Sequence, residues 1–395
     1  MIYADNAATT KTSAAAQKAM LETMDRFWGN PSSLYSFGQK AAEVLYQARA
    51  DVAACLNARP EEIYFTSGGS EADNQAIVSA ALIGKRKGRN HIITTPIEHH
   101  AVLHTVEKLA KDGFEVTYLP MDESGIVKVE DVRAAIRPET ALVTVMYANN
   151  EIGTIQPIAE IGALCREKQV PFHTDAVQAA GHIALDVAAQ NIDMLSLSGH
   201  KFHGPKGVGA LYVRRGVPLL SFIEGGAQER GRRAGTENLP AIVGMAAALK
   251  DACAGMAAHN AHVSALRDAL IDGLSAIPHC ALNGDRQRRL PGNVNFCFEG
   301  IEGESLLLLL DDKGVAASSG SACTSGSLDP SHVLLAIGRP HEVAHGSLRL
   351  TLDCENTMED VNYIIAAVKD VVDYLRNMSP VWKELLKGER NYVIQ

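Results

Sequence analysis

The chain has 395 residues and a formal charge of −9 at pH 7, from 37 Lys and Arg against 46 Asp and Glu. This acidic balance argues against nucleic acid as a partner, since nucleic-acid binding depends on basic surfaces. Residues 1–6 lack the basic and apolar regions of a signal sequence, and the longest aliphatic run, 306–310, is far shorter than a membrane span. We therefore expect a cytoplasmic protein of about two domains with no membrane partner.

The cysteines are odd in number and widely scattered. No Cys-x-x-Cys pair occurs that would indicate a structural zinc site or a redox dithiol, so we expect reduced thiols and no metal site. The seven positions are Cys55, Cys165, Cys253, Cys280, Cys297, Cys323 and Cys354.

Short β-branched or apolar runs alternate with helical patterns from about residue 62 to residue 213. This alternation predicts a mainly parallel sheet covered by helices. Ligands of such sheets bind at the carboxyl ends of the strands, so the polar residues that follow each run are the candidates for a site. The predicted strands are 63–66, 91–94, 116–119, 141–147, 170–174, 194–198 and 209–213.

A different pattern follows an Ala-rich helical stretch at 239–274. Strands at 293–298, 315–318 and 348–352 are interleaved with helices at 304–313 and 358–376, which predicts a smaller α+β domain. We expect an α/β protein with a large domain at 14–255 and a small domain formed by 1–13 and 256–395.

A Gly-rich turn follows the first predicted strand. Ser67-Gly68-Gly69-Ser70-Glu71 leads into a helical segment that Ser70 could cap, and small residues with free amides at a helix N-terminus suit a phosphate. Taken alone, such a segment can also be a simple turn.

Two further segments place charged residues just after buried strands. Asp175 ends an apolar run, where a carboxylate can pair with a protonated pyridine nitrogen or simply cap a helix. Lys201 follows the strand at 194–198 and is flanked by Ser, His and Gly, the surroundings that a Schiff-base lysine needs. Together the three segments predict pyridoxal 5′-phosphate (PLP) as the cofactor.

Nearly the whole chain resembles the NifS/IscS-type cysteine desulfurases, a group of fold-type I PLP enzymes within the class V aminotransferases. The motifs that carry the resemblance are the segments around Asp175 and Lys201 together with 3–10, 29–33, 97–102, 148–153, 229–238 and 318–327. The resemblance implies a fold-type I architecture, in agreement with the pattern of strands.

Roles follow from the resemblance position by position. It makes Lys201 the lysine that carries PLP, Asp175 the partner of the pyridine nitrogen, and His99 a ring that stacks on the cofactor and assists proton transfer. The other cofactor contacts that it implies are Gly69, Ser70, Ser198 and His200 at the phosphate, Asn150 and Gln178 near the phenolic oxygen, and Thr236 from the second subunit of a homodimer.

The substrate contacts come from the resemblance as well. Arg349 and Asn150 would contact the amino-acid substrate, with Arg349 binding its carboxylate, although an Arg on a strand is by itself typical of a surface ion pair. By itself, His99 could likewise be a structural histidine in a loop.

Cys323 decides which reaction is expected. It lies in a run of Ser, Thr, Ala and Gly, within a segment at about 318–330 whose composition predicts an exposed, mobile loop. Composition alone would make it an incidental thiol, whereas the resemblance makes it the nucleophile that takes sulfur from L-cysteine, giving L-alanine and a persulfide. The sulfur would pass to an acceptor protein such as an iron–sulfur scaffold, or toward modified tRNA.

The sequence is compatible with three other functions. A selenocysteine lyase or a class V aminotransferase of the same fold would use the same cofactor residues, and a non-catalytic sulfur or iron–sulfur scaffold would need none of them. The sequence also departs from the family pattern at Ser70, where Thr is more frequent, and at Ala227, where a Gly would tolerate a positive φ. The tail at 388–395 resembles no docking segment and reads as a frayed terminus.

Overall fold

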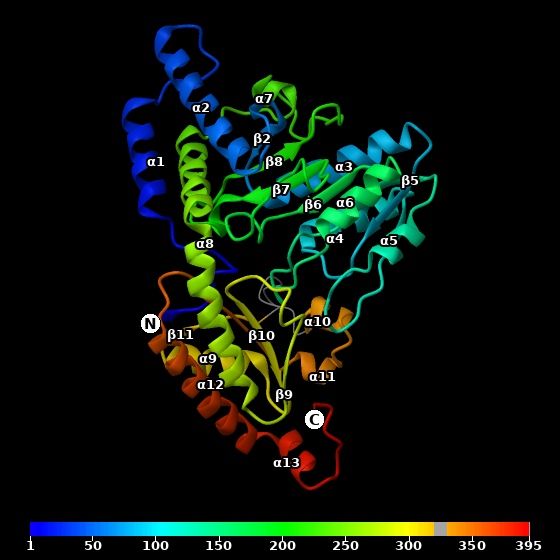
Figure 1. Ribbon diagram of the computed structural model, residues 1–395, viewed down its shortest axis with the longest axis vertical. Helices are drawn as coiled ribbons and strands as arrows, with labels where there is room; N and C mark the ends of the chain where they lie inside the picture. Colours follow the sequence, from blue (N-terminus) through cyan, green and yellow to red (C-terminus); the bar gives the residue numbers. More distant parts are fainter. Residues whose placement is uncertain (320–329, 395) are drawn as a thin grey trace.

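The computed structural model describes residues 1–319 and 330–394. Its upper part in Figure 1 is built on a seven-stranded sheet in which β8 runs antiparallel to both of its neighbours and the remaining pairs are parallel. The strands in spatial order are β2 (Ile63–Thr66), β8 (Gly209–Val213), β7 (Met194–Ser198), β6 (Phe172–Asp175), β5 (Thr140–Thr144), β3 (His91–Thr94) and β4 (Glu115–Tyr118). The expectation of a mainly parallel α/β sheet is confirmed.

Both faces of this sheet are buried, because successive side chains of a strand point to opposite sides. Ile92 and Leu142 pack with the helices α3 (Gly69–Lys85) and α4 (His100–Lys111), whereas their neighbours Ile93 and Val143 pack with α6 (Ile158–Glu167) and the first half of α8. The continuous apolar runs of the sequence are thus the strands of a three-layer sandwich. The short α5 (Val129–Ala135) lies at the side of α6, and η1 (Pro60–Glu62) precedes β2.

The lower part of the molecule has its own core. An antiparallel sheet in the order β12 (Ser347–Thr351), β10 (Asn293–Phe298), β9 (Cys280–Leu282) packs against the second half of α8 and against α12 (Met358–Met378). The chain begins here too, since β1 (Ile2–Tyr3) pairs with β11 (Val315–Ala316) and Ala4 is part of this core. The other helices of this lower part are α9 (Gly303–Asp312), α10 (His332–Ala336), α11 (His341–Ala344) and α13 (Pro380–Leu386).

The helix α8 (Leu239–Ser275) connects the two parts (Figure 1). It begins at Asn238, whose side chain accepts the Ala241 amide, and its first half packs against α1 (Ala14–Arg26) and α2 (Ser36–Cys55). Because α8 runs unbroken through residue 255, the domain division at 14–255 stays a prediction.

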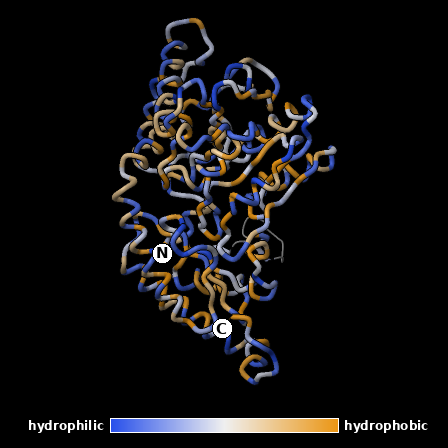
Figure 2. The backbone as a smooth tube through the Cα atoms, turned by 45° about the vertical axis from the view of Figure 1, so that its right-hand side comes forward, coloured by the Kyte–Doolittle hydropathy of each residue, from blue (hydrophilic) through white to orange (hydrophobic). Residues whose placement is uncertain are grey.

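Among the described residues, α8 is also the one helix with the length and hydropathy of a membrane span. Its two halves contribute to the two cores, and this burial accounts for its apolar composition. Figure 2 shows apolar segments running through both the upper and the lower part of the molecule.

Candidate active site

Ten of the twelve predicted site residues line one cavity of about 290 Å³, between the carboxyl ends of the main sheet and the small sheet. That volume is near the lower end of the range for small-molecule pockets, ~300–1,000 Å³. The ten are Gly69, Ser70, His99, Asn150, Asp175, Gln178, Ser198, His200, Lys201 and Arg349.

Lys201 ends the short helix η2 (Gly199–Lys201), which follows β7 directly. Its Nζ donates to the carbonyl oxygens of Ala7 (2.6 Å) and Ala8 (2.8 Å), and Gln178 Nε2 donates to the Ala7 oxygen as well (2.9 Å). The N-terminal segment therefore closes one side of the cavity and holds the lysine in place.

Asp175 lies at the end of β6, facing the same cavity. Its Oδ1 accepts the Val177 amide at 2.9 Å, and burial raises the pKa of its carboxyl to about 6, against the opposite influence of Lys201. A buried carboxylate of this kind requires a cationic partner, which a protonated pyridine nitrogen would supply.

Asp73, on α3, is a second buried acid of the cavity that the sequence did not single out. Neither of its oxygens has a hydrogen-bond partner, and His173 Nε2 lies 3.6 Å from Oδ1. Burial, and then the neighbouring Asp175, raise the pKa of Asp73 well above its usual range. Asp73 follows Gly69 by four residues, so the helical spacing alone could have placed both on the face of α3 that looks into the site.

His99 is the N-cap of α4, where its Nδ1 accepts the Ala101 amide at 3.1 Å. Burial, and next the charge of Lys201, lower the pKa of His99 to about 4, so the ring is neutral at pH 7. Because Nδ1 accepts, the proton of the neutral ring is on Nε2, which is left to donate.

The residues predicted to hold a phosphate line an adjoining cavity of about 480 Å³ at the start of α3. A Cβ added to Gly69 would lie 2.7 Å from Val177 Cγ2, so only glycine lets the helix approach the loop after β6 this closely. The prediction that Ser70 caps the helix is wrong: α3 begins at Gly69 and its N-cap is Gly68, which puts Ser70 inside the first turn with its amide unpaired by any cap side chain. His200, whose Nδ1 contacts Thr9 Oγ1 at 3.1 Å, also lines this cavity.

Arg349 is buried on β12, with 3% of its side chain exposed, and is not a surface residue. It donates to Asp5 Oδ1 at 2.9 Å and to the Asn150 carbonyl at 3.1 Å, while its Nε has no partner. The guanidinium is therefore fixed in direction at the cavity wall and keeps donor capacity for an incoming carboxylate.

Comparisons with known proteins agree with this geometry. The family model described as Aminotransferase class-V matches residues 2–364. A cysteine desulfurase IscS of Clostridium botulinum is 56% identical over 391 residues, covering 98% of each chain. Among solved structures, a NifS-like protein has a TM-score of 0.89 at 37% identity and covers 95% of this chain and 100% of its own. A structure described as SspA in complex with cysteine has a TM-score of 0.78 at 37% identity, covering 90% and 100%.

The chain belongs to the NifS/IscS-type cysteine desulfurases of the class V aminotransferase family. The residues of this family member fit PLP on structural grounds as well. The cofactor requires a lysine, an acid for its pyridine nitrogen and a site for its phosphate. The two cavities supply Lys201, the buried Asp175 with Asp73 as a second buried acid, and the helix N-terminus at Gly69 and Ser70.

Two predicted site residues stand apart. Thr236 is exposed and lines neither cavity of its own chain, so its contact with a phosphate in a second subunit stays a prediction. Cys323, with most of the segment at 318–330, lies outside the described residues, and its role stays a prediction too.

Two expectations outside the site are corrected. Ala227 has φ −88°, so it does not occupy a left-handed conformation, and its Cβ causes no strain. The tail is not frayed: the amides of Val393 and Ile394 donate to the Glu299 carboxylate, and Tyr392 stacks on His279 at 3.8 Å.

Proposed function

We propose that this protein is a PLP-dependent cysteine desulfurase that converts L-cysteine to L-alanine and leaves a persulfide on Cys323. The observation that carries the proposal is the single cavity that brings Lys201, Asp175 and Arg349 together with the phosphate cradle. The names of the relatives support the reaction, and a structure described with bound cysteine supports the substrate.

Bound PLP supplies an electron sink for bond cleavage at the substrate. Lys201 would anchor the cofactor through Nζ and, once the substrate amine has displaced it, move the proton of the substrate Cα. Asp175 would keep the pyridine nitrogen protonated, and Arg349 would orient the substrate by its carboxylate. His99 presents a neutral imidazole whose Nε2–H can donate toward the reacting groups.

Cys323 would attack the substrate sulfur as a thiolate. A sulfur–sulfur bond forms, the carbon–sulfur bond breaks, and the substrate carbon regains a proton to give L-alanine. We propose that the persulfide sulfur then passes to an acceptor protein, such as an iron–sulfur scaffold.

We also propose a cytoplasmic homodimer. Thr236 is exposed on its own chain, as expected of a residue that completes the site of a second subunit. Large apolar side chains on α1, α2 and the turn between them are also exposed, which is typical of a protein interface. They are Leu21, Met24, Trp28, Leu34, Tyr35 and Tyr46. Sedimentation velocity should give twice the mass of 42.3 kDa; a monomer at micromolar concentration would contradict the proposal.

The reaction is tested with Cys323→Ser. The variant should keep the absorption band of lysine-bound PLP but form neither persulfide nor alanine. The control is Cys253→Ser, which removes a free thiol on α8 that does not line the cavity. Normal turnover by Cys323→Ser would refute the proposal. Transfer of the amino group to a 2-oxo acid would instead identify an aminotransferase, and a strong preference for selenocysteine would identify a selenocysteine lyase.

A further inference from the structure

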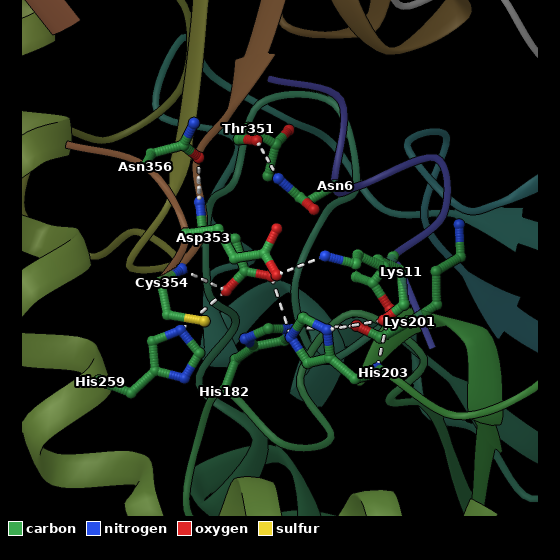
Figure 3. A network of polar contacts seen from close by, with 12 residues as sticks. Asn6, Lys11, His182, Lys201, His203, His259, Thr351, Asp353, Cys354 and Asn356 are labelled. Atoms are coloured by element: carbon green, nitrogen blue, oxygen red, sulfur yellow. Dashed lines mark hydrogen bonds and ion pairs between the residues drawn. The ribbon is translucent and has the colours of Figure 1, made fainter. Parts of the chain in front are cut away.

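Four donor side chains from three distant segments meet beside a third, larger cavity of about 980 Å³. They are His203 after η2, His259 in the middle of α8, and Asp353 with Cys354 after β12, and we refer to them as the His-Asp-Cys cluster. Figure 3 shows the Asp353 carboxylate facing both imidazoles, with the Cys354 sulfur close to His259. None of the four was singled out as a candidate ligand from the sequence, because no two of the segments are neighbours along the chain.

Three of the four side chains form a compact donor set, and His203 joins it through Asp353. Asp353 Oδ1 is 2.7 Å from His259 Nε2, and its Oδ2 is 2.9 Å from His203 Nε2. The ligand atoms of His259, Asp353 and Cys354 lie within 4.8 Å of one another. Only 8% of the Asp353 side chain is exposed, whereas Cys354 lies open to the cavity, so an ion can enter.

The ring of His203 is oriented by contacts at both of its nitrogens. Its Nδ1 lies 3.1 Å from the Lys11 carbonyl oxygen, which can only accept, so Nδ1 carries the proton of the neutral ring. Its Nε2 faces the Asp353 carboxylate at 2.9 Å, and this carboxylate raises the pKa of His203, so the two groups form an ion pair when the ring is protonated. A metal-bound histidine typically donates its other ring N–H to a backbone carbonyl in this way, and an ion bound at Nε2 would take the place of the proton shared with Asp353.

The backbone at His203 is consistent with a constrained position. Its φ is +64°, in the left-handed region that a non-glycine residue adopts at a cost of ~1 kcal/mol or more. Thr10 Oγ1 accepts the His203 amide at 2.8 Å and holds this conformation. The nearby ammonium of Lys11 is directed to Glu355 at 2.8 Å on the exposed rim, so the cluster itself keeps its negative charge.

We propose that the His-Asp-Cys cluster binds one divalent transition-metal ion of the zinc type. Two imidazole nitrogens, a carboxylate oxygen and a thiolate form a mixed tetrahedral donor set that suits Zn²⁺, and with the thiol deprotonated they balance its charge. The ion would tie the loop after Lys201 and the end of the Arg349 strand to α8. This site is independent of the proposed desulfurase reaction.

The test is a titration of the metal-free, PLP-loaded enzyme with Zn²⁺ by calorimetry, and with Co²⁺ by absorption. All proteins carry Cys323→Ser, which removes the other thiol under study. We expect one ion per chain and a cobalt–thiolate charge-transfer band. Cys354→Ser should abolish that band, and both Cys354→Ser and His259→Asn should weaken Zn²⁺ binding by at least ~10-fold.

His262→Asn is the matched control, because His262 lines the same cavity but its Nε2 contacts the Asn356 carbonyl oxygen at 3.0 Å. It should bind Zn²⁺ as the parent does. Because Cys354 is exposed, its replacement by Ser leaves the core intact, which circular dichroism verifies. Absence of stoichiometric binding, equal affinity in Cys354→Ser, or an equal loss in His262→Asn would overturn the proposal. The readout is metal binding, so inactivity of the enzyme toward cysteine leaves this test unaffected.

Discussion

Glu98, buried next to the cofactor cavity, allows a quantitative prediction. Its Oε1 accepts the Thr95 hydroxyl at 2.7 Å and the Met146 amide at 2.9 Å, whereas its Oε2 has no partner. Burial raises the pKa of Glu98 from 4.5 to about 8. The folded protein therefore keeps a proton on Glu98 over a pH range in which the unfolded chain releases it.

The direction of the effect follows from proton linkage. Between pH 4.5 and about 8 the folded state binds more protons at Glu98 than the unfolded state, so the free energy of unfolding falls as the pH rises. At about 1.36 kcal/mol per pH unit, the loss attributable to Glu98 is roughly 4–5 kcal/mol. Glu98→Gln keeps the acceptor oxygen and removes the titration, so the stability of the variant relative to the wild type should rise by roughly that amount between pH 5 and pH 9.

Urea unfolding followed by far-UV circular dichroism at fixed ionic strength, from pH 5 to pH 9, measures this difference directly. Taking the variant minus the wild type cancels the titration of the groups that the two proteins share. Glu61→Gln, at an exposed position, corrects for the exchange of Glu for Gln itself. Curves for Glu98→Gln and the wild type that run parallel across this pH range would refute the reasoning.

Two further substitutions probe the cavity walls. Arg349→Lys keeps the charge but loses the planar pair of donors, so KM for cysteine should rise ~10–100-fold, the equivalent of ~1.5–3 kcal/mol, with kcat less affected. Steady-state kinetics that show a lower kcat at unchanged KM would contradict a substrate-binding role. Gly69→Ala places a methyl group 2.7 Å from Val177 Cγ2, and the overpacking of ~1–3 kcal/mol should weaken PLP binding ~5–100-fold in a fluorescence titration of the apoenzyme. Gly255→Ala, on α8 with no atom near the added Cβ, should bind PLP as the wild type does.

The main sheet could be predicted because its strands are buried on both faces. Continuous apolar runs such as 194–198 and 209–213 leave little choice but a central strand, and both match the structure residue for residue. Strand ends were less certain: the run at 141–147 is a strand only from Thr140 to Thr144, because the chain then turns toward the cavity. The reversal of β8 left no signal, since antiparallel pairing depends on the path of the chain and not on composition.

The site was predictable where a residue follows a strand, and less so elsewhere. Asp175 ends β6 and Lys201 ends the short helix that follows β7, so position and chemistry point to the same place. Asp73 lies within a helix that contains several other polar residues, and nothing in the sequence sets it apart from them. Only the fold reveals that its carboxyl is buried without a hydrogen-bond partner. Asp5 and Arg349 are 344 residues apart, and no local pattern predicts that they pair.

The N-terminal segment is the structural link between the two halves of the site. Its Ala7 carbonyl accepts from both Lys201 and Gln178, and two residues earlier Asp5 pairs with Arg349. A substrate carboxylate at Arg349 would share the guanidinium with Asp5, which accepts from Nη2 and leaves Nε without a partner. Arg349 on the small sheet and Lys201 beyond the large sheet are therefore coupled through the three residues 5–7, and a change at Asp5 acts on both the substrate-binding and the cofactor-binding ends of the cavity.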